Sequence, residues 1–483
     1  MARKSLERLF QDRPFAFCAT ITIGAALKPF LGVPAEAQDW FDSSVARNCS
    51  YPGVTWHELL PLDEELIERM RHCEIIFMDT VNRLEWKRRI PYDTRKLWYL
   101  RHLRFWNDYL HRHRINLFLS AWLPHEIPDI IIYHLCKLKG IPVLYFRAST
   151  ERDTEFAEHD LEESAFRLRD RYRALLAERP EGKAEDVVLN AAFEDRFTAL
   201  TVPEGQKPVI ESIKLLTYKD HVSQLLLRRP LQFLRFGLRY LSPVGWVRAL
   251  GAMQRWRSVR ARKAFYDVHA VEPDFSQPYV YMALHFQPEA SSLPMGGAYA
   301  DQVLMATLLD RFLPDGVLLY IKEHPRESGW LTRTIEQYQT LLSLKHVRLV
   351  KRSADTFKLR EHCQAVATVT GSVGYEALFR GKPVFLFGHC FYQYAQGVHP
   401  IHTAEDCEKA VHAVFTEGKR PSPYTSRLFM KAMEESRTGG LLDPWGIRVT
   451  ALPDEEHVRA NAASLLRELL ELEEAMAAVS FSR

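Results

Sequence analysis

Residues 370–374 read Thr-Gly-Ser-Val-Gly and combine two glycines with two hydroxyl side chains. They lie between an apolar stretch and a helix-like segment. Backbone N–H groups and the helix dipole at such a position favour an anion, and glycine lets a phosphate approach the backbone closely. The acidic side chain two residues further on can reach back to a ribose hydroxyl. The alternative is a plain glycine-rich turn whose acid only complements the helix dipole. The spacing predicts a nucleotide site formed by Thr370, Gly371, Ser372, Gly374 and Glu376.

A second polar group, Lys322-Glu323-His324-Pro325, directly follows the apolar run VLLYI. Lysine and histidine together suit a phosphate or a leaving group that gains negative charge. Pro325 would fix the turn so that His324 points in one direction. The alternative is a solvated turn in which His324 caps a neighbouring helix. We expect Lys322, His324 and Pro325 to contribute to the same nucleotide site.

Residues 284–297 (LHFQPEASSLPMGG) form a third polar segment after an apolar run. Its polar side chains include His285 and Gln287, and the glycine pair at its end can make a flexible or phosphate-facing turn. We expect His285 and Gln287 to contribute to the nucleotide site, although a surface connection is a plausible alternative.

The N-terminal half offers candidates for a general base in the segment SAWLPHEIPD at residues 120–129. His125 and Glu126 are the side chains that can accept a proton from a substrate hydroxyl. Asp129 is a third candidate, but its place just after Pro128 suits a helix-capping role better. We therefore predict His125 and Glu126 as catalytic residues, together with His324.

These motifs lie in two regions where apolar runs alternate with helical patterns, which is typical of parallel βαβ layers. In the first region the patterns predict helices over 63–72 and 129–139 and strands over 74–78, 116–120 and 141–146. In the second region they predict helices over 300–312, 332–342 and 355–362 and strands over 279–284, 317–321, 347–350, 365–369 and 384–387. Gly381 and Pro383 mark a helix stop and a strand start.

The pattern predicts an α/β fold with two Rossmann-like layers that face a cleft, and a helical basic insertion between them. The expected domains are a Rossmann-like layer over 1–150, a helical basic segment over 151–275, a second Rossmann-like layer over 276–440 and a helical tail over 441–483. In open parallel sheets, ligands bind beyond the carboxyl ends of the strands. The polar loops above follow strands, so we expect them to meet at that edge.

Composition limits the class of protein. The 483 residues have a net charge of +3, which gives no argument for a nucleic-acid partner. Seven cysteines without a CxxC pair favour a reducing compartment, and no cluster of metal ligands is evident. Residues 15–27 imitate a signal peptide, but the acidic Glu7 and Asp12 precede them, so we expect a buried strand and loop. The prediction is a cytoplasmic protein.

A basic stretch over 221–263 interleaves arginines with aromatic residues, and no acid occurs between Asp220 and Asp267. It can be an amphipathic segment that lies on a membrane surface and meets an anionic or lipid-linked acceptor. It can also be a solvated helical linker. Nucleic-acid binding is a third possibility, but no recognised module accompanies the stretch.

The C-terminal half resembles the bacterial capsule polysaccharide biosynthesis family, which includes the Kdo-linker transferases. The resemblance covers roughly 279–400 and is carried by IKEHP at 321–325 and TGSVGYEALFRGKPVFLFG at 370–388, followed by Phe391 and Tyr392. The N-terminal half matches this family only in style.

The resemblance implies a GT-B fold, with an activated-sugar donor on the C-terminal domain and the acceptor in the cleft. By analogy His324, Thr370 and Ser372 would hold the phosphate of a CMP-sugar and Glu376 its ribose, with no metal ion or other cofactor. The chain departs from the Gln-x-x-x-Asp pattern of the Kdo-transferring members, since Gln287 is followed by Ser291. The donor sugar therefore stays open.

The leading hypothesis is a glycosyltransferase for capsule or lipopolysaccharide that uses a nucleotide-sugar donor, with a glycan or lipid-linked acceptor. The donor would be CMP-linked, with a Kdo-like or other acidic sugar. One alternative is a related enzyme, such as a UDP-sugar epimerase or a polyol-phosphate transferase. Another is a non-catalytic capsule assembly or export factor that docks through 221–263.

Overall fold

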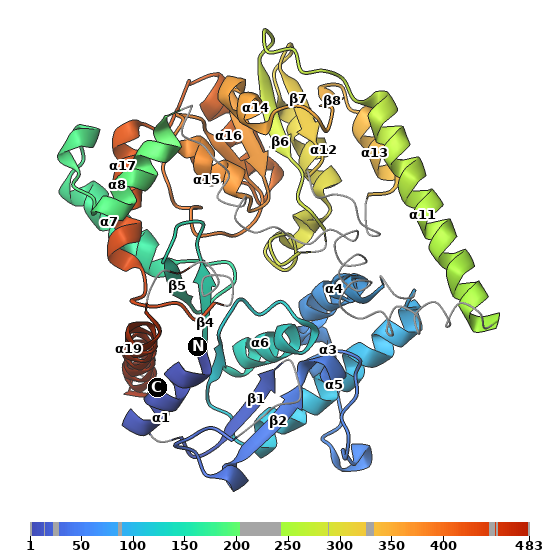
Figure 1. Ribbon diagram of the computed structural model, residues 1–483, viewed down its shortest axis with the longest axis vertical. Helices are drawn as coiled ribbons and strands as arrows, with labels where there is room; N and C mark the ends of the chain where they lie inside the picture. Colours follow the sequence, from blue (N-terminus) through green and yellow to red (C-terminus); the bar gives the residue numbers. More distant parts are fainter. Residues whose placement is uncertain are drawn as a thin grey trace, which may run out of the picture.

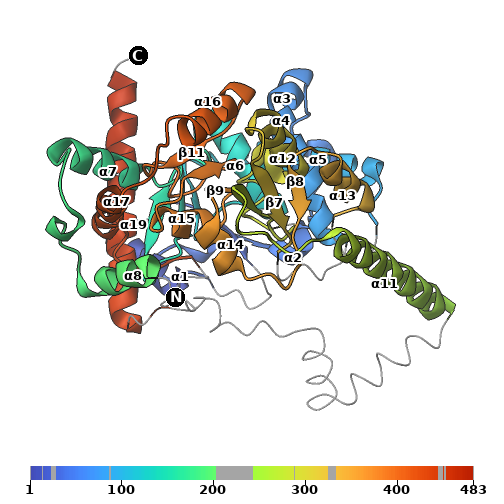
Figure 2. The same cartoon turned by 90° about the horizontal axis from the view of Figure 1, so that it is seen from above.

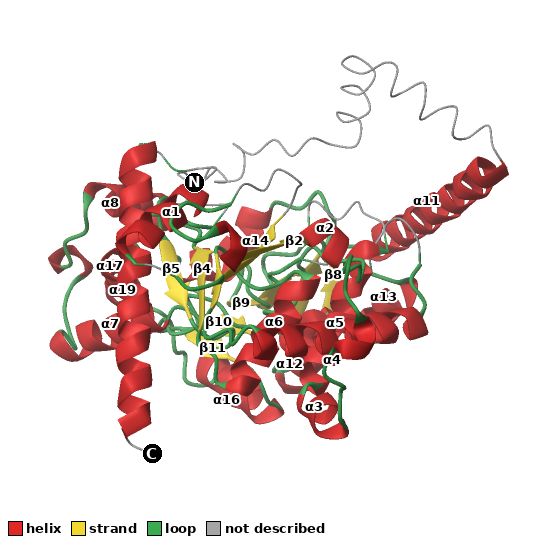
Figure 3. Ribbon diagram, turned by 90° about the horizontal axis from the view of Figure 1, so that it is seen from below, coloured by secondary structure: helices red, strands yellow, loops and turns green. Residues whose placement is uncertain are grey.

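The computed structural model describes residues 2–13, 15–22, 29–85, 89–202, 243–287, 289–324, 333–443, 450 and 453–481. The chain forms two α/β units, which lie one above the other in Figure 1. The N-terminal unit is blue and cyan, and the C-terminal unit is yellow and orange. Helices surround the strands of both units (Figure 3). The predicted α/β class is confirmed.

The C-terminal unit is built on one six-stranded sheet in which every pairing is parallel. Its spatial order is β11-β10-β9-β6-β7-β8. Counted along the chain from β6, this is the strand order of a Rossmann fold, in which the order reverses beside the first strand. The strands are β6 (Tyr279–Ala283), β7 (Leu318–Lys322), β8 (Val347–Leu349), β9 (Ala365–Thr368), β10 (Val384–Leu386) and β11 (Val398–Pro400).

Helices cover both faces of this sheet, which explains why its strands read as continuous apolar runs. Strand β9 is buried along its whole length. One apolar core joins the sheet to α12 (Gln302–Phe312), α13 (Ile335–Leu342) and α16 (Ala404–Phe415). The core on the other face includes α14 (Thr356–His362), α15 (Ser372–Leu378) and α17 (Pro423–Ser436). The five strands predicted for this region are confirmed, with ends shifted by one or two residues.

The described residues of the N-terminal unit form two small sheets, of two and three strands, where a full Rossmann layer has one larger parallel sheet. Strands β1 (Cys18–Thr22) and β2 (Gln38–Asp42) form a parallel pair. A separate sheet has the order β3-β4-β5, in which β5 runs antiparallel to β4. Its strands are β3 (Phe118–Ser120), β4 (Val143–Ala148) and β5 (Glu155–Glu158). The helices are α1 (Ala2–Asp12), α2 (Ser43–Ala46), α3 (Glu64–Arg69), α4 (Arg71–Thr80), α5 (Tyr92–Arg112) and α6 (Ile127–Lys139).

The strand predicted over 74–78 is wrong, because these residues lie within helix α4. Cys73, Ile76, Phe77 and Thr80 are buried, whereas Ile75 is 61% exposed. Buried positions three or four residues apart are the period of a helix, while a strand would bury alternate residues. The predicted strand over 15–27 is confirmed in part: β1 occupies 18–22 and is half-buried, and 23–28 lie outside the described residues.

The described helices of the segment between the two units lie in two different places. Helices α7 (Phe166–Glu178) and α8 (Ala191–Thr201) pack on α17, and their apolar residues belong to the same core as strands β9 and β10. Helix α11 (Pro243–His269) leaves the body of the C-terminal unit (Figure 2). Of the predicted basic stretch, residues 221–242 lie outside the described part.

The chain returns to its beginning at the C-terminus. Helix α19 (Asp454–Phe481) packs against α1, and the two lie side by side in Figure 1. The predicted tail helix over 460–478 is therefore a longer element that joins the core of the N-terminal unit. No helix among the described residues is long and apolar enough to cross a membrane.

Candidate functional site

The loops after β6 and β9 meet at the point where the strand order of the C-terminal sheet reverses. The His285 ring, after β6, lies 3.0 Å from the Thr368 hydroxyl at the end of β9, measured from its Nε2 atom. The amide of Thr370 donates to the same Nε2 atom over 3.3 Å, and the amide of Gly371 donates to the Thr368 hydroxyl over 3.1 Å. This edge is the crevice in which open α/β sheets bind ligands.

His285 holds this crevice together as a neutral ring. It is only 9% exposed, and burial lowers its pKa to about 3, with His324 and Arg333 nearby adding to the effect. Because Nε2 accepts a hydrogen bond from the Thr370 amide, this nitrogen carries no hydrogen of its own. The structure thus places His285 as a support for the 370–374 loop.

Ser372 and Val373 carry donors that have no hydrogen-bond partner among the described residues. The Thr370 hydroxyl donates to the carbonyl of Ser291 over 2.6 Å, so it ties the β9 loop to the β6 loop. The amides of Ser372 and Val373 and the Ser372 hydroxyl make no hydrogen bond within the part of the chain that the structure describes. These donors lie in the first turn of α15, where an anion can accept from them.

The two loop glycines are required by the protein's own packing. A Cβ atom at Gly371 would lie 2.7 Å from the Thr368 hydroxyl. A Cβ atom at Gly374 would lie 2.7 Å from the Tyr392 hydroxyl and 3.0 Å from the Val384 side chain. The prediction that these glycines make room for a phosphate stays a prediction, since close internal packing already explains both.

The loop after β7 is anchored by a buried ion pair that no sequence motif indicates. Arg333 donates to the Glu323 carboxylate over 2.8 Å and to the carbonyl of His285 over 3.1 Å. Both side chains are almost fully buried. The ring of Phe286 lies 6.1 Å from that of His324, which places the predicted His324 beside the β6 loop. The three loops therefore converge, as predicted.

The same prediction also included Lys322 and Pro325. Lys322 is buried, its ammonium lies 3.4 Å from the Thr356 hydroxyl at the start of α14, and burial lowers its pKa. Lys322 therefore contacts helix α14. Pro325 lies outside the described residues.

Glu376 and Gln287 are engaged inside the C-terminal unit. The Glu376 carboxylate pairs with the buried Arg360, although a quarter of its side chain remains exposed. The Gln287 amide donates to the carbonyl of Ala300. Each would have to share or exchange its present partner to bind a ribose or a phosphate.

The predicted base candidates lie at the start of α6 in the N-terminal unit. The His125 ring bonds through Nδ1 to the carbonyl of Leu123 over 2.7 Å. A carbonyl only accepts, so Nδ1 carries the hydrogen and Nε2 keeps a lone pair. Burial lowers the pKa of His125, so the ring is neutral and can accept a proton at neutral pH. Glu126 pairs with Arg47 over 2.8 Å.

Asp129 does not cap its helix, because it lies in the first turn of α6 and Glu126 occupies the capping position. Burial raises the pKa of Asp129 to about 7, and the nearby Glu126 adds to the rise. A carboxylate with this pKa remains a competing candidate for the base.

Arg83 joins the two units at this point. Its guanidinium donates to the carbonyl of His125 over 2.6 Å and also to the carbonyl of Leu293, in the loop after β6. One side chain thus joins the loop that contains His125 to the loop after β6. No sequence signal identifies Arg83 or Arg333, because both act through partners that are distant in the chain.

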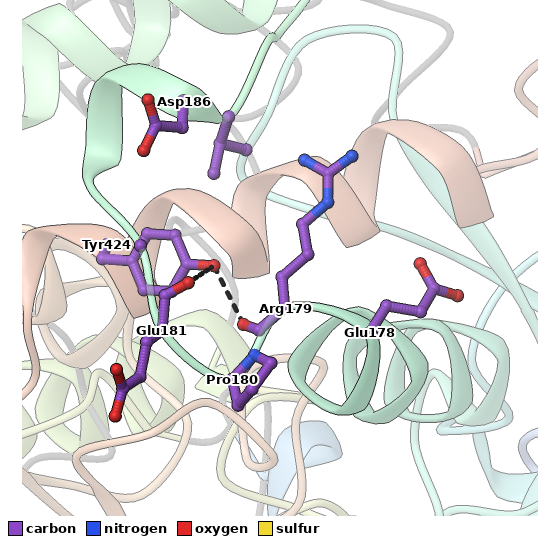
Figure 4. A pocket seen from close by; sticks show the side chains of 8 residues that line it. Glu178, Arg179, Pro180, Glu181, Asp186 and Tyr424 are labelled. Carbon is purple, nitrogen blue, oxygen red and sulfur yellow. Dashed lines mark hydrogen bonds between the residues drawn. The ribbon is translucent and has the colours of Figure 1, made fainter.

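A hollow elsewhere on the molecule contains none of the predicted site residues. It lies where the end of α7 meets α17, and Tyr424 donates there to the carbonyl of Arg179 over 2.9 Å (Figure 4). Its lining includes the acidic side chains of Glu178, Glu181 and Asp186. These carboxylates would repel a phosphate, so we do not place a nucleotide there. Among the described residues, no cluster of side chains could hold a metal ion.

Solved structures show only distant likeness to this chain. The β-Kdo 2,7 transferase of Thermosulfurimonas dismutans KpsC is 15% identical, with a TM-score of 0.23, over 36% of this chain and 60% of that one. Its β-Kdo 2,4 transferase is 12% identical, with a TM-score of 0.27, over 64% and 78%. The UDP-GlcNAc 2-epimerase of Methanocaldococcus jannaschii is 12% identical, with a TM-score of 0.26, over 77% and 98%. No curated protein matches the sequence.

The family comparison is more specific. Residues 239–412 match the family described as capsule polysaccharide biosynthesis protein. The match contains the whole six-stranded sheet and the three converging loops after β6, β7 and β9. It confirms the resemblance, because IKEHP and TGSVGYEALFRGKPVFLFG both lie within the matched residues.

Proposed function

We propose that the protein is a glycosyltransferase of bacterial surface polysaccharide biosynthesis that binds a nucleotide-sugar donor at the crevice between β6 and β9. One observation carries the proposal: the family match coincides with the sheet whose reversal point brings His285, His324 and the Ser372 loop together. Ligands of parallel α/β sheets bind at such points.

The donor phosphate would lie against the amides of Ser372 and Val373, which the described part of the chain leaves without a hydrogen-bond partner, with the Ser372 hydroxyl as a further donor. His324 would stabilise the negative charge that the nucleotide gains as it leaves. Thr368, Thr370 and His285 would keep these donors in place, because their hydrogen bonds fix the loop. A CMP-linked, acidic sugar is the donor class that we favour from the sequence motifs, and no metal or other cofactor is invoked.

The acceptor, a glycan or glycolipid, would approach from the N-terminal unit. In an inverting transfer, Nε2 of His125 removes the proton of the acceptor hydroxyl while the oxygen attacks the anomeric carbon. The bond from that carbon to the nucleotide phosphate breaks, and the phosphate leaves with the electron pair. Glu126, 3.9 Å from His125 Nε2, would stabilise the imidazolium that forms.

The test is a thermal-shift titration of the full chain with CMP, CDP, UDP and GDP. We expect CMP to stabilise the protein most, with about 2.7 kcal/mol at a hundredfold excess over Kd. His324→Ala and Ser372→Ala should weaken the shift, while the control His111→Ala, at an exposed position of α5, should leave it unchanged. A preference for UDP or CDP would contradict the CMP-linked donor and favour an epimerase-like or polyol-phosphate enzyme. No shift with any nucleotide would contradict the donor site itself.

A further inference from the structure

Helix α11 carries a stripe of large apolar side chains that no other described part of the chain covers. Trp246 is 63% exposed, Leu250 52%, Met253 43% and Trp256 53%. These positions lie three or four residues apart, so they share one side of the helix. We call these four residues the α11 stripe.

The opposite side of the helix is the one that faces the protein. Val259 and Arg262 are half-buried and Tyr266 is fully buried, where its hydroxyl donates to the carbonyl of Val350. Among the described residues, the last turns of α11 therefore make its contacts with the C-terminal unit. The first turns, which carry the stripe, stand away from the body in both views (Figures 1 and 2).

The charged side chains around the α11 stripe are all basic. Arg257 and Arg260 follow it and are exposed, and the Arg260 guanidinium lies 5.3 Å from the centre of the Trp256 ring. No acidic residue occurs in the helix before Asp267. Exposed tryptophans and arginines without acidic neighbours form an apolar and positively charged surface. Its complement is a partner with a negatively charged outer layer and an apolar layer below it.

We propose that α11 docks the protein on the surface of an anionic lipid bilayer. Tryptophan prefers the headgroup level of a bilayer, Leu250 and Met253 can enter the acyl boundary, and the arginines can remain at the phosphate level. A single-stranded nucleic acid would use the aromatic rings as stacking platforms but would gain little from the aliphatic members of the stripe. The lipid surface therefore accounts for more of the exposed side chains. This inference is independent of the transferase activity.

The experiment is co-sedimentation of the full chain with vesicles of phosphatidylcholine alone or with about one quarter phosphatidylserine. We expect binding to the anionic vesicles and weakening at high salt. Trp246→Ser with Trp256→Ser should abolish binding. Arg257→Glu with Arg260→Glu should weaken it about 25-fold or more, since each basic residue near an anionic surface contributes about fivefold.

Matched controls make the same chemical changes elsewhere. Leu97→Ser with Val188→Ser removes exposed apolar side chains, and Arg348→Glu with Lys358→Glu reverses two exposed charges. Both controls should bind as the unchanged protein does, and circular dichroism should show that every variant is folded. The proposal is overturned if the protein sediments with neither kind of vesicle, or if the controls lose as much binding as the α11 variants. It is also overturned if the α11 variants lose binding to a single-stranded RNA oligonucleotide but retain vesicle binding.

Discussion

At the scale of single residues, the crevice is held by side chains whose partners are far apart in sequence. His285 and Thr368 meet across the reversal of the strand order, and Arg333 reaches both Glu323 and the carbonyl of His285. The sequence identified His285 and His324 because each follows an apolar run. It could not show that His285 supports a loop, because that role depends on a partner 83 residues away.

The pH dependence of transfer separates the two base candidates. A base works only when unprotonated, so kcat/KM falls as pH drops through its pKa. Because burial lowers the pKa of His125 below its usual 6.5, we expect half-maximal kcat/KM below pH 6.5. His125→Ala should lower kcat roughly 100- to 10,000-fold. An acid limb centred near pH 7, the pKa of Asp129, together with loss of activity in Asp129→Asn, would show that Asp129 is the base.

At the scale of elements, the C-terminal unit was predictable and the N-terminal unit less so. In the former, buried parallel strands alternate with helices that begin at capping residues such as Asp355 and Thr403. In the latter, the short apolar run at 74–78 fits either a strand or a helix segment, and periodicity over five residues does not decide between them. In the structure the segment is helical, and Cys73, Ile76 and Phe77 are buried on one side of that helix.

The packing of the first turn of α15 requires glycine at position 374. Gly374→Ala would place a Cβ atom 2.7 Å from the Tyr392 hydroxyl, whose hydrogen bond to the carbonyl of Gly371 fixes the loop. We expect a loss of about 1–3 kcal/mol in the free energy of unfolding, measured by urea denaturation, and weaker nucleotide binding. Gly439→Ala is the control, because its Cβ would meet nothing closer than 3.6 Å. Equal stability of the two variants would refute this account of the loop.

At the scale of the whole molecule, the chain binds its units together at several places. Helix α19 returns to α1, α7 packs on α17, and Arg83 links the loops of His125 and Leu293. The two-unit arrangement follows from the sequence, since two regions alternate strands and helices. The crossing of the C-terminal helix to the N-terminal unit does not, because an amphipathic helix carries no information about which core it will cover.

Arg83 should therefore matter for function more than for stability. Arg83→Met removes the hydrogen bond to the carbonyl of His125 and the one that crosses to the carbonyl of Leu293, so the loop that contains His125 would no longer be tied to the loop after β6. We expect kcat to fall about tenfold or more, because misplacement of a catalytic group by 1 Å can cost about 100-fold. Arg104→Met is the control, since Arg104 donates to the carbonyls of Leu59 and Leu60 within one unit. Similar kcat values for the two variants would contradict a role for Arg83 in joining the units.

The most direct test of the central claim is hydrogen–deuterium exchange of the full chain with and without the nucleotide that stabilises it most. The account predicts slower exchange on binding in peptides that contain 285–287 and 369–374, with the amides of Ser372 and Val373 among those protected. Peptides of α19 should be unchanged. Protection confined to the hollow between α7 and α17, or absent from the 369–374 loop, would contradict the claim that the crevice at the strand reversal is the donor site.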